Sequence, residues 1–235
     1  MQDAAEKKKF VKEKFSSISN NYDLINSLVS FRIDRYWRWV TTRELRPFPE
    51  GAVLDLCAGT MPLALELTRQ APERRVLAVD FCEDMIRAGL RTLPADERRQ
   101  RITPVCGDGE DIPAVDNSFW GCTVAFGIRN ISRPQRGLNE MYRVLKPGGK
   151  LLILEFSRPT NFIVKPLYFF YLNRILPLVA GMVSGDKEAY EYLASSIARF
   201  YEPEEFLTMM RQAGFSRSYR RTLTFGVVSI YVGIK

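Results

Sequence analysis

The stretch VLDLCAGTMPLALEL, residues 53–67, is the part of the sequence that indicates the fold most clearly. Residues 53–56 form an apolar run with one carboxylate, which is typical of a buried strand, and residues 63–67 indicate the beginning of a helix. A turn between a strand and a helix is where a nucleotide-like cofactor binds in many α/β proteins. Such a turn is usually rich in glycine, but this one keeps only Gly59, which Met61 and Pro62 follow closely.

The same alternation of strand and helix continues along the chain. Apolar runs that predict strands lie at 52–56, 76–80, 102–106, 121–126 and 150–155, with helical stretches between them at 62–70, 83–92 and 135–145. Continuous apolar strands alternating with helices are typical of a parallel sheet covered on both faces. Two further β-like runs, 216–224 and 226–233, are expected to close the sheet as an antiparallel pair. We therefore predict an α/β fold with a doubly wound, mostly parallel, seven-stranded sheet.

Around this sheet the sequence predicts one domain, 1–235, built of four segments. Residues 1–45 have apolar side chains at helical spacing and predict an N-terminal helical cap. The predicted ligand-binding core is 50–156, the helical lid insertion is 160–200, and the C-terminal helix and strands are 202–235. Lys146-Pro147-Gly148-Gly149 is expected to be a turn before the fifth strand.

Composition limits the chemistry that the chain can perform. The 235 residues include no histidine, which excludes an imidazole base and argues against a zinc enzyme, so we expect no metal site. The four cysteines lie far apart, each in or beside a predicted strand, and are expected to be reduced thiols of the core. The net charge of +7 favours an anionic partner, although most of it, the run Lys7-Lys8-Lys9 included, is expected on the solvated surface.

Three carboxylates stand where predicted strands end. Asp55 and Asp80 belong to the ends of the first two strands, and Asp108 follows the third within residues 106–109. The carboxyl ends of parallel strands meet at one edge of the sheet, so we expect all three around one crevice. Asp80 is placed to accept hydrogen bonds from ribose hydroxyls, and Asp108 to meet an adenine amino group. Because carboxylates repel a pyrophosphate, the crevice suits a cationic, sugar-bearing ligand such as S-adenosylmethionine.

Three segments of the sequence are similar to one family. YDLIN at 22–26, followed by Ser30, Arg35 and Trp37, resembles the amino-terminal signature of the ubiquinone/menaquinone biosynthesis C-methyltransferases (UbiE/MenG type). These are class I S-adenosylmethionine-dependent methyltransferases. RVLKPGG at 143–149, which runs on to Glu155-Phe156-Ser157, resembles the second signature, and FGIRN at 126–130 is also similar to the family. The resemblance covers the chain from about Phe15 to the carboxyl terminus.

The resemblance implies a role for each matched position. It implies S-adenosylmethionine as cofactor, held by Asp55, Gly59, Thr60, Asp80, Asp108 and Gly109. It implies a catalytic pair that faces the ring to be methylated, Arg129 and Asn130, and a substrate cover that includes Tyr22, Asn26 and Asp34. The implied reaction is C-methylation of a polyprenylated quinol, of the demethylmenaquinol or the demethylubiquinol type, in respiratory quinone biosynthesis. This chemistry mainly needs alignment and an arginine beside the forming phenolate, so it does not require histidine.

The chain departs from the family pattern in the cofactor turn and in the amino-terminal signature. Ala58 and Met61 stand where the family usually has glycine, Pro62 where it has an acidic residue, and Asp34 where it has histidine. Proline is accepted in the first turn of a helix, with Thr60 as the expected N-cap. A positive φ at Met61 would strain it, and its side chain is expected at the methionine end of the cofactor. We expect the turn to bind the cofactor nonetheless, and Met61→Gly to tighten binding or leave it unchanged.

Residues 162–184 form the most apolar stretch of the chain. Lys165, Asn173 and Arg174 interrupt it, and its unbroken runs are shorter than the roughly 20 residues that a membrane span needs. Two interpretations remain: a helix pair packed in the core, and a lid that shelters a polyprenyl tail and rests on the bilayer. Positive charge supports the second, so we expect a cytoplasmic protein in peripheral contact with the inner face of the membrane. The sequence leaves a homodimer open.

Two other functions stay open. A methyltransferase of RNA or protein would suit the basic composition, but residues 127–130 lack the Asp/Asn-Pro-Pro-aromatic motif of many base N-methyltransferases. No RNA-binding module is visible, so no nucleic-acid partner is expected. A cofactor-binding relative without activity would suit the changes at Met61, Pro62 and Asp34.

Overall fold

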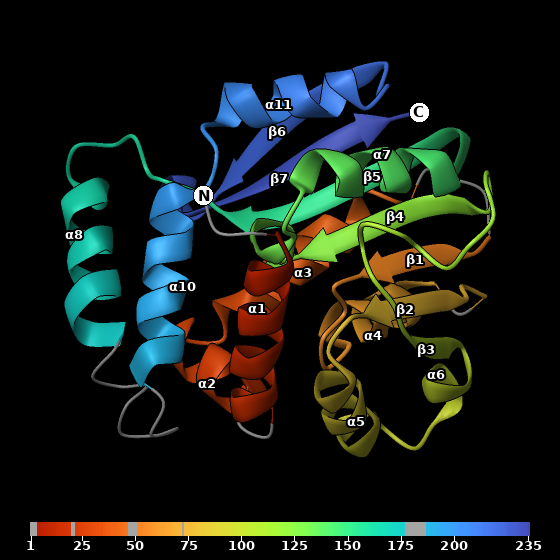
Figure 1. The fold of residues 1–235 in the computed structure, drawn as a ribbon, viewed down its shortest axis with the longest axis horizontal. Coiled ribbons are helices and arrows are strands. Elements are labelled where there is room, and N and C mark those ends of the chain that lie inside the picture. Colours follow the sequence, from red (N-terminus) through yellow and green to blue (C-terminus); the bar gives the residue numbers. More distant parts are fainter. Residues whose placement is uncertain (1–3, 20–21, 47–50, 72, 177–186) are drawn as a thin grey trace.

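The computed structural model describes residues 4–19, 22–46, 51–71, 73–176 and 187–235, and within them the strands form one sheet with helices on both faces (Figure 1). The strands are β1 (Val53–Leu56), β2 (Val76–Asp80), β3 (Ile102–Cys106), β4 (Phe119–Ala125), β5 (Leu145–Phe156), β6 (Arg217–Leu223) and β7 (Val228–Ile234). The helices are α1 (Ala4–Ile18), α2 (Tyr22–Val29), α3 (Ile33–Arg43), α4 (Pro62–Gln70), α5 (Glu83–Thr92), α6 (Glu97–Gln100), α7 (Pro134–Val144), α8 (Val164–Phe170), α10 (Lys187–Arg199) and α11 (Pro203–Gln212). Three short helical turns are η1 (Ile128–Asn130), η2 (Tyr171–Ile175), which has π-helical hydrogen bonding, and η3 (Thr224–Gly226).

The sheet has the order β3-β2-β1-β4-β5-β7-β6, and the predicted α/β fold is confirmed. The strands β1 to β5 run parallel, whereas β7 lies antiparallel between β5 and β6, so the C-terminal pair closes the sheet as predicted. Side chains of successive residues enter opposite cores: Leu54 and Leu56 join a cluster with α7 and α11, and Val53 joins one with α3 and α4. Burial on both faces explains why the strands are continuous apolar runs in the sequence.

The segment Lys146-Pro147-Gly148-Gly149 belongs to a strand rather than to a turn. It lies within β5, and the pairing of β4 with β5 shifts its register along this segment. Gly148 has a φ of +77°, a conformation that a residue with a side chain rarely adopts. The glycine therefore lets the strand bulge, and the expected turn is replaced by an irregular beginning of β5.

The cysteines differ in burial, which corrects the expectation of four core thiols. Cys82 and Cys122 are buried, Cys57 is half-buried, and Cys106 is exposed. Cys106 ends β3, and β3 is the edge strand of the sheet, so part of its surface has no neighbouring strand to cover it.

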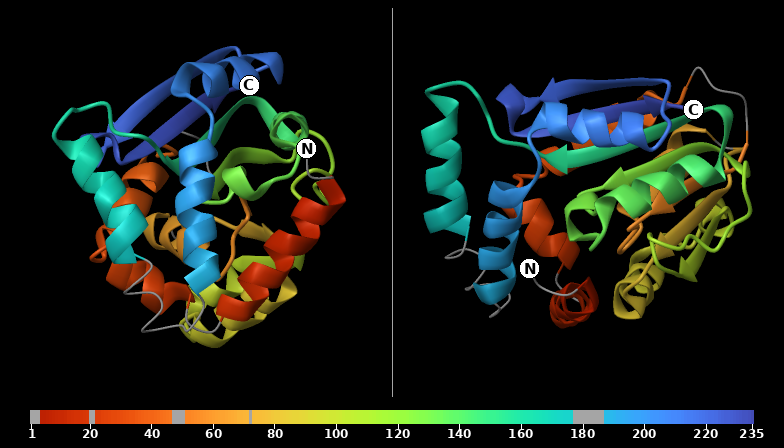
Figure 2. Two further views of the ribbon diagram at one scale, coloured as in Figure 1. Left: turned by 60° about the vertical axis from the view of Figure 1, so that its left-hand side comes forward. Right: turned by 45° about the horizontal axis from the view of Figure 1, so that its top comes forward.

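Helices α1, α8 and α10 gather at one end of the sheet, on the left of Figure 1, and the views of Figure 2 agree. The arrowheads of β1, β4 and β5 point toward the same end. The carboxyl ends of the parallel strands therefore face helices from the beginning of the chain and from its second half. In sheets of this type, ligands bind at that end.

The apolar stretch at 162–184 begins with a short helix. It runs through α8 and η2 to Leu176, and its remainder lies outside the described residues. Within the described ranges, no helix combines the length and the hydropathy that crossing a membrane requires.

Candidate active site

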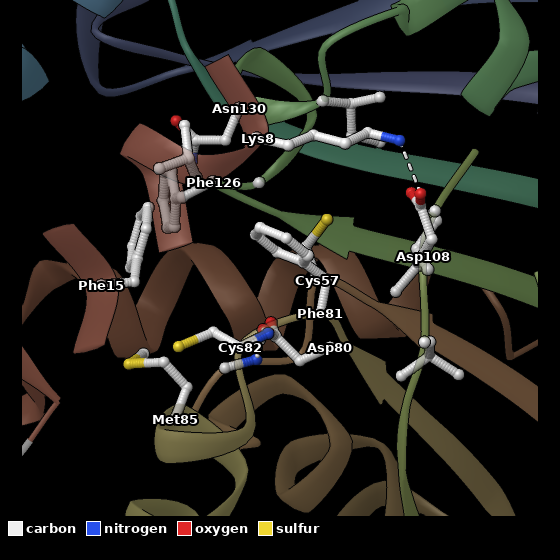
Figure 3. Close-up of a pocket in the computed structure, with 18 of the residues that line it drawn as sticks. Lys8, Phe15, Cys57, Asp80, Phe81, Cys82, Met85, Asp108, Phe126 and Asn130 are labelled. Carbon is white, nitrogen blue, oxygen red and sulfur yellow. Dashed lines mark hydrogen bonds and ion pairs between the residues drawn. The ribbon is translucent and has the colours of Figure 1, made fainter. Parts of the chain in front are cut away.

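A cavity opens where the strand order reverses, because β1 lies between β2 and β4 (Figure 3). Its volume is about 710 Å³ when counted out to its mouth. The wall comes from the loops that follow β1, β2, β3 and β4 and from α1, and it includes Gly59, Asp80, Asp108, Gly109 and Asn130. The structure thus places these predicted site residues around one space, although they are distant in the sequence.

Asp80 holds the turn after β1 in position. Its Oδ2 accepts a hydrogen bond from the backbone N–H of Gly59 at 2.8 Å, and its Oδ1 accepts one from the backbone N–H of Cys82 at 2.8 Å. Burial raises the pKa of the Asp80 carboxyl, and these backbone hydrogen bonds lower it in part. Each carboxylate oxygen can accept more than one hydrogen bond, so Asp80 can also accept from ligand hydroxyls on the cavity side.

Asp108 is paired with a side chain from the opposite end of the sequence. Lys8 of α1 donates to Oδ2 of Asp108 at 2.6 Å and lies 3.1 Å from Oε2 of Glu110 (Figure 3). Burial acts to raise the pKa of Asp108, but the hydrogen bonds from Lys8 and from the backbone N–H of Glu110 hold it below its ordinary value. The carboxyl of Asp108 is therefore ionised at neutral pH.

Lys7 also contacts the segment after β4, so the run Lys7-Lys8-Lys9 is not only solvated surface. Lys7 Nζ donates to the backbone oxygens of Arg129 at 3.2 Å and Ile131 at 2.9 Å. Burial lowers the pKa of Lys7. Together Lys7 and Lys8 fasten α1 to the loops after β3 and β4, and Lys9 is left exposed.

Thr60 and Met61 belong to the cofactor turn but do not line the cavity. Thr60 Oγ1 donates to Oδ1 of Asp23 in α2 at 2.6 Å, so it ties the turn to the N-terminal helices instead of capping α4. Met61 is itself the N-cap residue, and its φ of +67° is the positive value at which methionine is strained. Its side chain is fully buried and reaches toward Gly89 of α5. The expectation that this side chain packs at the cofactor end of the turn is therefore wrong.

Asp55 lies behind the turn, outside the wall of the cavity. Side chains alternate along a strand, so Leu56 faces the cavity and Asp55 faces the opposite way. Oδ1 of Asp55 accepts a hydrogen bond from Thr123 Oγ1 in β4 at 2.8 Å. Burial raises the pKa of this carboxyl to about 7, while hydrogen bonds from Thr123 and from the backbone of Ala64 lower it in part. Asp55 thus connects β1, β4 and the beginning of α4.

A second cavity adjoins the first, with a volume of about 1260 Å³ when counted out to its mouth. Phe15, Tyr22 and Phe126 line both cavities and so form the boundary between them. The rest of the second wall is mostly aromatic and aliphatic and comes from α1, α2, α3, α8, η2 and α10. Four of the predicted site residues lie on it, namely Tyr22, Asn26, Asp34 and Arg129.

Arg129 forms a buried ion pair at the second cavity. Its Nη1 donates to Oε1 of Glu155 at 2.8 Å and to the backbone oxygen of Phe126, and its Nε donates to Ser196 Oγ at 3.2 Å. The side chain of Arg129 is 6% exposed and that of Glu155 is not exposed at all. Burial raises the pKa of Glu155, and the charge of Arg129 lowers it in part. These contacts fix the guanidinium in one orientation.

Asp34 forms a further buried ion pair on the same wall. It accepts a hydrogen bond from Ser30 Oγ at 2.8 Å and is paired with Arg38, one helical turn later in α3. Where the family signature carries histidine, this chain therefore has a carboxylate whose charge Arg38 neutralises.

Two aromatic rings in tilted contact lie between the two buried arginines. The ring centroids of Phe126 and Phe156 are 4.5 Å apart. The guanidinium of Arg38 lies 5.7 Å from the centroid of Phe126, and that of Arg129 lies 5.7 Å from the centroid of Phe156. Trp37 contacts both rings edge-on. An apolar ligand entering this cavity therefore meets aromatic faces with positive charge beside them.

The structure adds three residues to the site that the sequence did not single out. Glu155 lies near the carboxyl end of β5, as Asp55 and Asp80 lie at the ends of their strands. A search for carboxylates at predicted strand ends could therefore also have found Glu155. Lys8 had no local signal, because its role depends on where α1 docks. The same holds for Tyr192 of α10, whose hydroxyl donates to Oδ1 of Asn130 at 3.1 Å.

Solved structures share the fold of this chain. A SAM-dependent methyltransferase of Thermotoga maritima superimposes with a TM-score of 0.68 at 23% identity, covering 96% of this chain and 99% of the other. Phosphoethanolamine N-methyltransferase 2 of Haemonchus contortus, in complex with S-adenosyl-L-methionine, gives a TM-score of 0.62 at 15% identity, covering 84% of this chain and 52% of the other. At such identities the likeness shows a common fold.

Sequence relatives identify the family. A ubiquinone/menaquinone biosynthesis C-methyltransferase UbiE of Geotalea daltonii is 38% identical over 231 residues, covering 98% of each chain. A demethylmenaquinone methyltransferase of Porphyromonas gingivalis is 41% identical over 226 residues, covering 96% of this chain and 92% of the relative. The family model described as ubiE/COQ5 methyltransferase matches residues 1–235. On this evidence, and in agreement with the two adjoining cavities, the chain belongs to the ubiE/COQ5 methyltransferase family.

Proposed function

We propose that this protein transfers a methyl group from S-adenosylmethionine to a ring carbon of a demethylated, polyprenylated quinol in respiratory quinone biosynthesis. Methyl transfer is the activity of its family, and relatives named for quinone methylation span nearly the whole chain. The observation that carries the proposal is the pair of adjoining cavities bounded by Phe15, Tyr22 and Phe126. One has carboxylates at strand ends for a nucleoside-like cofactor, and the other has aromatic walls for an apolar ring.

The wall of the first cavity fits S-adenosylmethionine. When bound, this cofactor supplies a methyl group made electrophilic by a positively charged sulfur. Asp80 would hold the ribose hydroxyls and Asp108 the adenine, and their negative charges suit a cationic ligand. A Cβ added at Gly109 would lie 3.2 Å from Ile131 and 3.3 Å from Leu56, so a side chain here would crowd the wall of the cavity. Gly59 would approach the methionine part.

Asp55 and Thr60 are proposed to support the cofactor site from behind. The Asp55 carboxyl joins β1 to β4 beneath the turn, and Thr60 joins the turn to Asp23 of α2. Both residues would therefore fix where the backbone of Gly59 lies without touching the cofactor.

Arg129 would stabilise the negative charge that develops on a ring oxygen as the quinol loses its phenolic proton. Its guanidinium is already held by Glu155 and Ser196, so little reorganisation accompanies the reaction. Asn130, which accepts from Tyr192, lines the first cavity, and Arg129 lines the second. We propose that the two side chains order the water that takes the proton at the point where the cavities meet.

The polyprenyl tail would lie along the second cavity, under a lid formed by residues 160–200. The described part of this lid contributes Tyr168 and Leu172 to the cavity wall. Its outer surface carries exposed apolar side chains, among them Phe162, Leu167 and Phe170. We propose that this surface rests on an anionic membrane, from which the substrate enters the second cavity.

The proposal is tested by incubating the purified protein anaerobically with S-adenosylmethionine and two reduced acceptors, a prenylated demethylnaphthoquinol and a prenylated demethylbenzoquinol. Mass spectrometry is expected to show one methyl group added to a ring carbon of at least one acceptor. The choice between the two acceptors also settles which quinol class is the substrate. If neither acceptor is methylated while the cofactor binds, the proposed reaction is wrong.

A variant of the arginine tests its role in the reaction. Replacing Arg129 alone would leave Glu155 buried without its partner, so the double variant Arg129→Gln, Glu155→Gln is the better choice. We expect turnover to fall by about 10²-fold to 10³-fold, as when a charge-stabilising group is removed. Calorimetry with S-adenosylhomocysteine is expected to give the parent affinity. Parent-like turnover would remove Arg129 from the mechanism.

A further inference from the structure

Polar side chains on the wall of the second cavity are generally paired with one another. Asp34 is paired with Arg38, Arg129 with Glu155, and Thr224 Oγ1 accepts a hydrogen bond from Trp37 Nε1 at 2.7 Å. A cavity meant only for an apolar tail would have no use for a polar atom without a partner, because each such atom costs free energy when buried.

Tyr168 is an exception to this pairing. It lies on α8 and lines the second cavity, and only 9% of the residue is exposed. Its hydroxyl has no hydrogen-bond partner among the described residues. The surroundings are apolar, since Tyr168 packs with Leu172, Leu176 and Ile197. Phenylalanine would fill the same volume without a buried, unsatisfied hydroxyl, so the hydroxyl needs an explanation outside the protein.

Tyr168 and Arg129 line the same cavity, Tyr168 from α8 and Arg129 from η1. Burial raises the pKa of Tyr168 far above its ordinary value, so the hydroxyl keeps its proton at neutral pH. Tyr168 thus offers a neutral hydrogen-bond donor from the lid side, while Arg129 offers a charged donor from η1.

We infer that the Tyr168 hydroxyl donates a hydrogen bond to a ring oxygen of the substrate, so that Tyr168 and Arg129 each hold one of two oxygens on the same ring. This inference rests on the proposed function, because a quinol is a ring with two such oxygens. Held at one oxygen only, a ring can rotate in an aromatic cavity. Held at two oxygens from different elements, it presents a fixed edge to the first cavity. Tyr168 is therefore a substrate-binding residue that decides which ring carbon faces the methyl group.

The inference explains why a donor on α8 matters to the site. The hydroxyl gains its partner only when an oxygenated ring is present, so the substrate itself would help to hold α8 against the cavity. A tail or lipid without ring oxygens would leave the hydroxyl unpaired and bind less well.

The test compares the parent with Tyr168→Phe, and Tyr142→Phe serves as a control because Tyr142 lies in α7, away from both cavities. The probes are 1,4-dihydroxynaphthalene, with two ring oxygens, and 1-naphthol, with one. Dissociation constants are measured by calorimetry under anaerobic conditions in the presence of S-adenosylhomocysteine. The parent and Tyr142→Phe are expected to bind the first probe about tenfold more tightly than the second, the usual worth of one hydrogen bond. Tyr168→Phe is expected to bind both probes equally.

Stability and kinetics separate this role from a structural one. Because the hydroxyl has no partner among the described residues, Tyr168→Phe is expected to melt at the parent temperature or above it, and a lower melting temperature would contradict the inference. With the quinol that the parent methylates, the variant is expected to show a KM raised about tenfold and an unchanged cofactor affinity. An unchanged preference for the two-oxygen probe overturns the role of Tyr168, whatever the parent methylates. A parent with the expected preference that methylates neither quinol would instead refute the proposed function.

Discussion

Met61 shows how a strained residue can be retained in a cofactor turn. Its φ of +67° lies in the region that favours glycine, as does that of Gly59, +56°. The strain costs about 1 to 2 kcal/mol. The side chain offsets this cost because it is fully buried beneath α5, where Gly89 leaves it room. Methionine at this position thus adds a contact in the core and leaves the first cavity open.

Met61→Gly is expected to lower the free energy of unfolding by about 1 to 3 kcal/mol, because losing a buried methionine costs more than the relieved strain returns. Cofactor affinity is expected to stay the same, since the side chain does not line the cavity. Urea unfolding and calorimetry measure the two quantities. Phe225→Gly is the matched control: Phe225 has a similar φ, +54°, but is 82% exposed, so this change is expected to be neutral or stabilising. A more stable Met61→Gly protein would contradict this account.

Asp55 makes stability depend on pH in an identifiable window. Burial raises its folded-state pKa to about 7, above the ordinary value of 3.8 that the carboxyl has in the unfolded chain. Between about pH 4 and pH 7 the folded protein therefore keeps a proton that the unfolded chain has released. The stability that this proton provides is complete below about pH 4 and is lost as the pH rises through 7.

Asp55→Asn removes this titration. Relative to the variant, the parent is expected to lose up to about 4 kcal/mol of unfolding free energy between pH 4 and pH 8. The comparison needs urea unfolding of both proteins at several pH values, because other carboxyls titrate in both and cancel in the difference. A difference that stays constant with pH would mean that Asp55 is ionised throughout this range.

At the scale of elements, α1 forms part of the wall of the first cavity. It contributes Lys8, Val11 and Phe15 to the wall and is fastened by Lys7 and Lys8. On the proposal that the cofactor lies in this cavity and leaves past α1, the two lysines would slow its release.

The double variant Lys7→Gln, Lys8→Gln is expected to release S-adenosylhomocysteine about 5-fold to 20-fold faster than the parent, which corresponds to about 1 to 2 kcal/mol for charge-assisted hydrogen bonds. Stopped-flow displacement measures the rate. Added salt is expected to accelerate release from the parent more than from the variant, because the Lys8 ion pair is partly exposed. Lys9→Gln, at an exposed position, is expected to behave as the parent. Equal rates for all three proteins would show that α1 does not gate the cavity.

The helix α8 and the turn η2 have two apolar sides. Tyr168, Leu172 and Leu176 are buried toward the second cavity. On the outside, Ile163, Leu167 and Phe170 are 56%, 64% and 60% exposed. A helix that is apolar on both sides normally has both of them covered, and the second side here lies at the molecular surface. Lys165 and Arg174 are exposed on the same short segment and would suit anionic headgroups.

At the scale of the whole molecule, the exposed apolar side of α8 predicts binding to anionic membranes. The parent is expected to cosediment with vesicles that contain phosphatidylglycerol, and less with neutral vesicles or at high salt. The triple variant Phe162→Ser, Leu167→Ser, Phe170→Ser is expected to lose most of this binding, while methylation of a short-tailed, water-soluble quinol stays near the parent rate. A control variant at another exposed apolar residue, Val115→Ser, lies away from α8 and is expected to bind as the parent does. Retained binding by the triple variant would exclude α8 as the membrane contact.

The sequence by itself determined the sheet and the strand ends of this protein. Strand and helix periodicity is local, so the parallel order of elements and the C-terminal antiparallel pair could be predicted from it, and Asp80 and Asp108 could be placed at one edge. Predictions from local sequence were less reliable where the conformation of one residue decides which way a side chain or the backbone points. Because side chains alternate along a strand, Asp55 faces away from the cavity. At Gly148 the sequence predicted a turn, but the structure has a bulged strand.

Only the tertiary structure decided which helices cover the cavities and which polar side chains on their walls are paired. Lys8 meets Asp108 across 100 residues of sequence, and Arg129 meets Glu155 because η1 follows β4, which pairs with β5 in the sheet. The packing of α8 leaves the Tyr168 hydroxyl without a hydrogen-bond partner within the part of the chain that the structure describes. Such contacts depend on where helices dock, and docking is fixed by the combined burial of side chains from many segments, which no short stretch of sequence specifies.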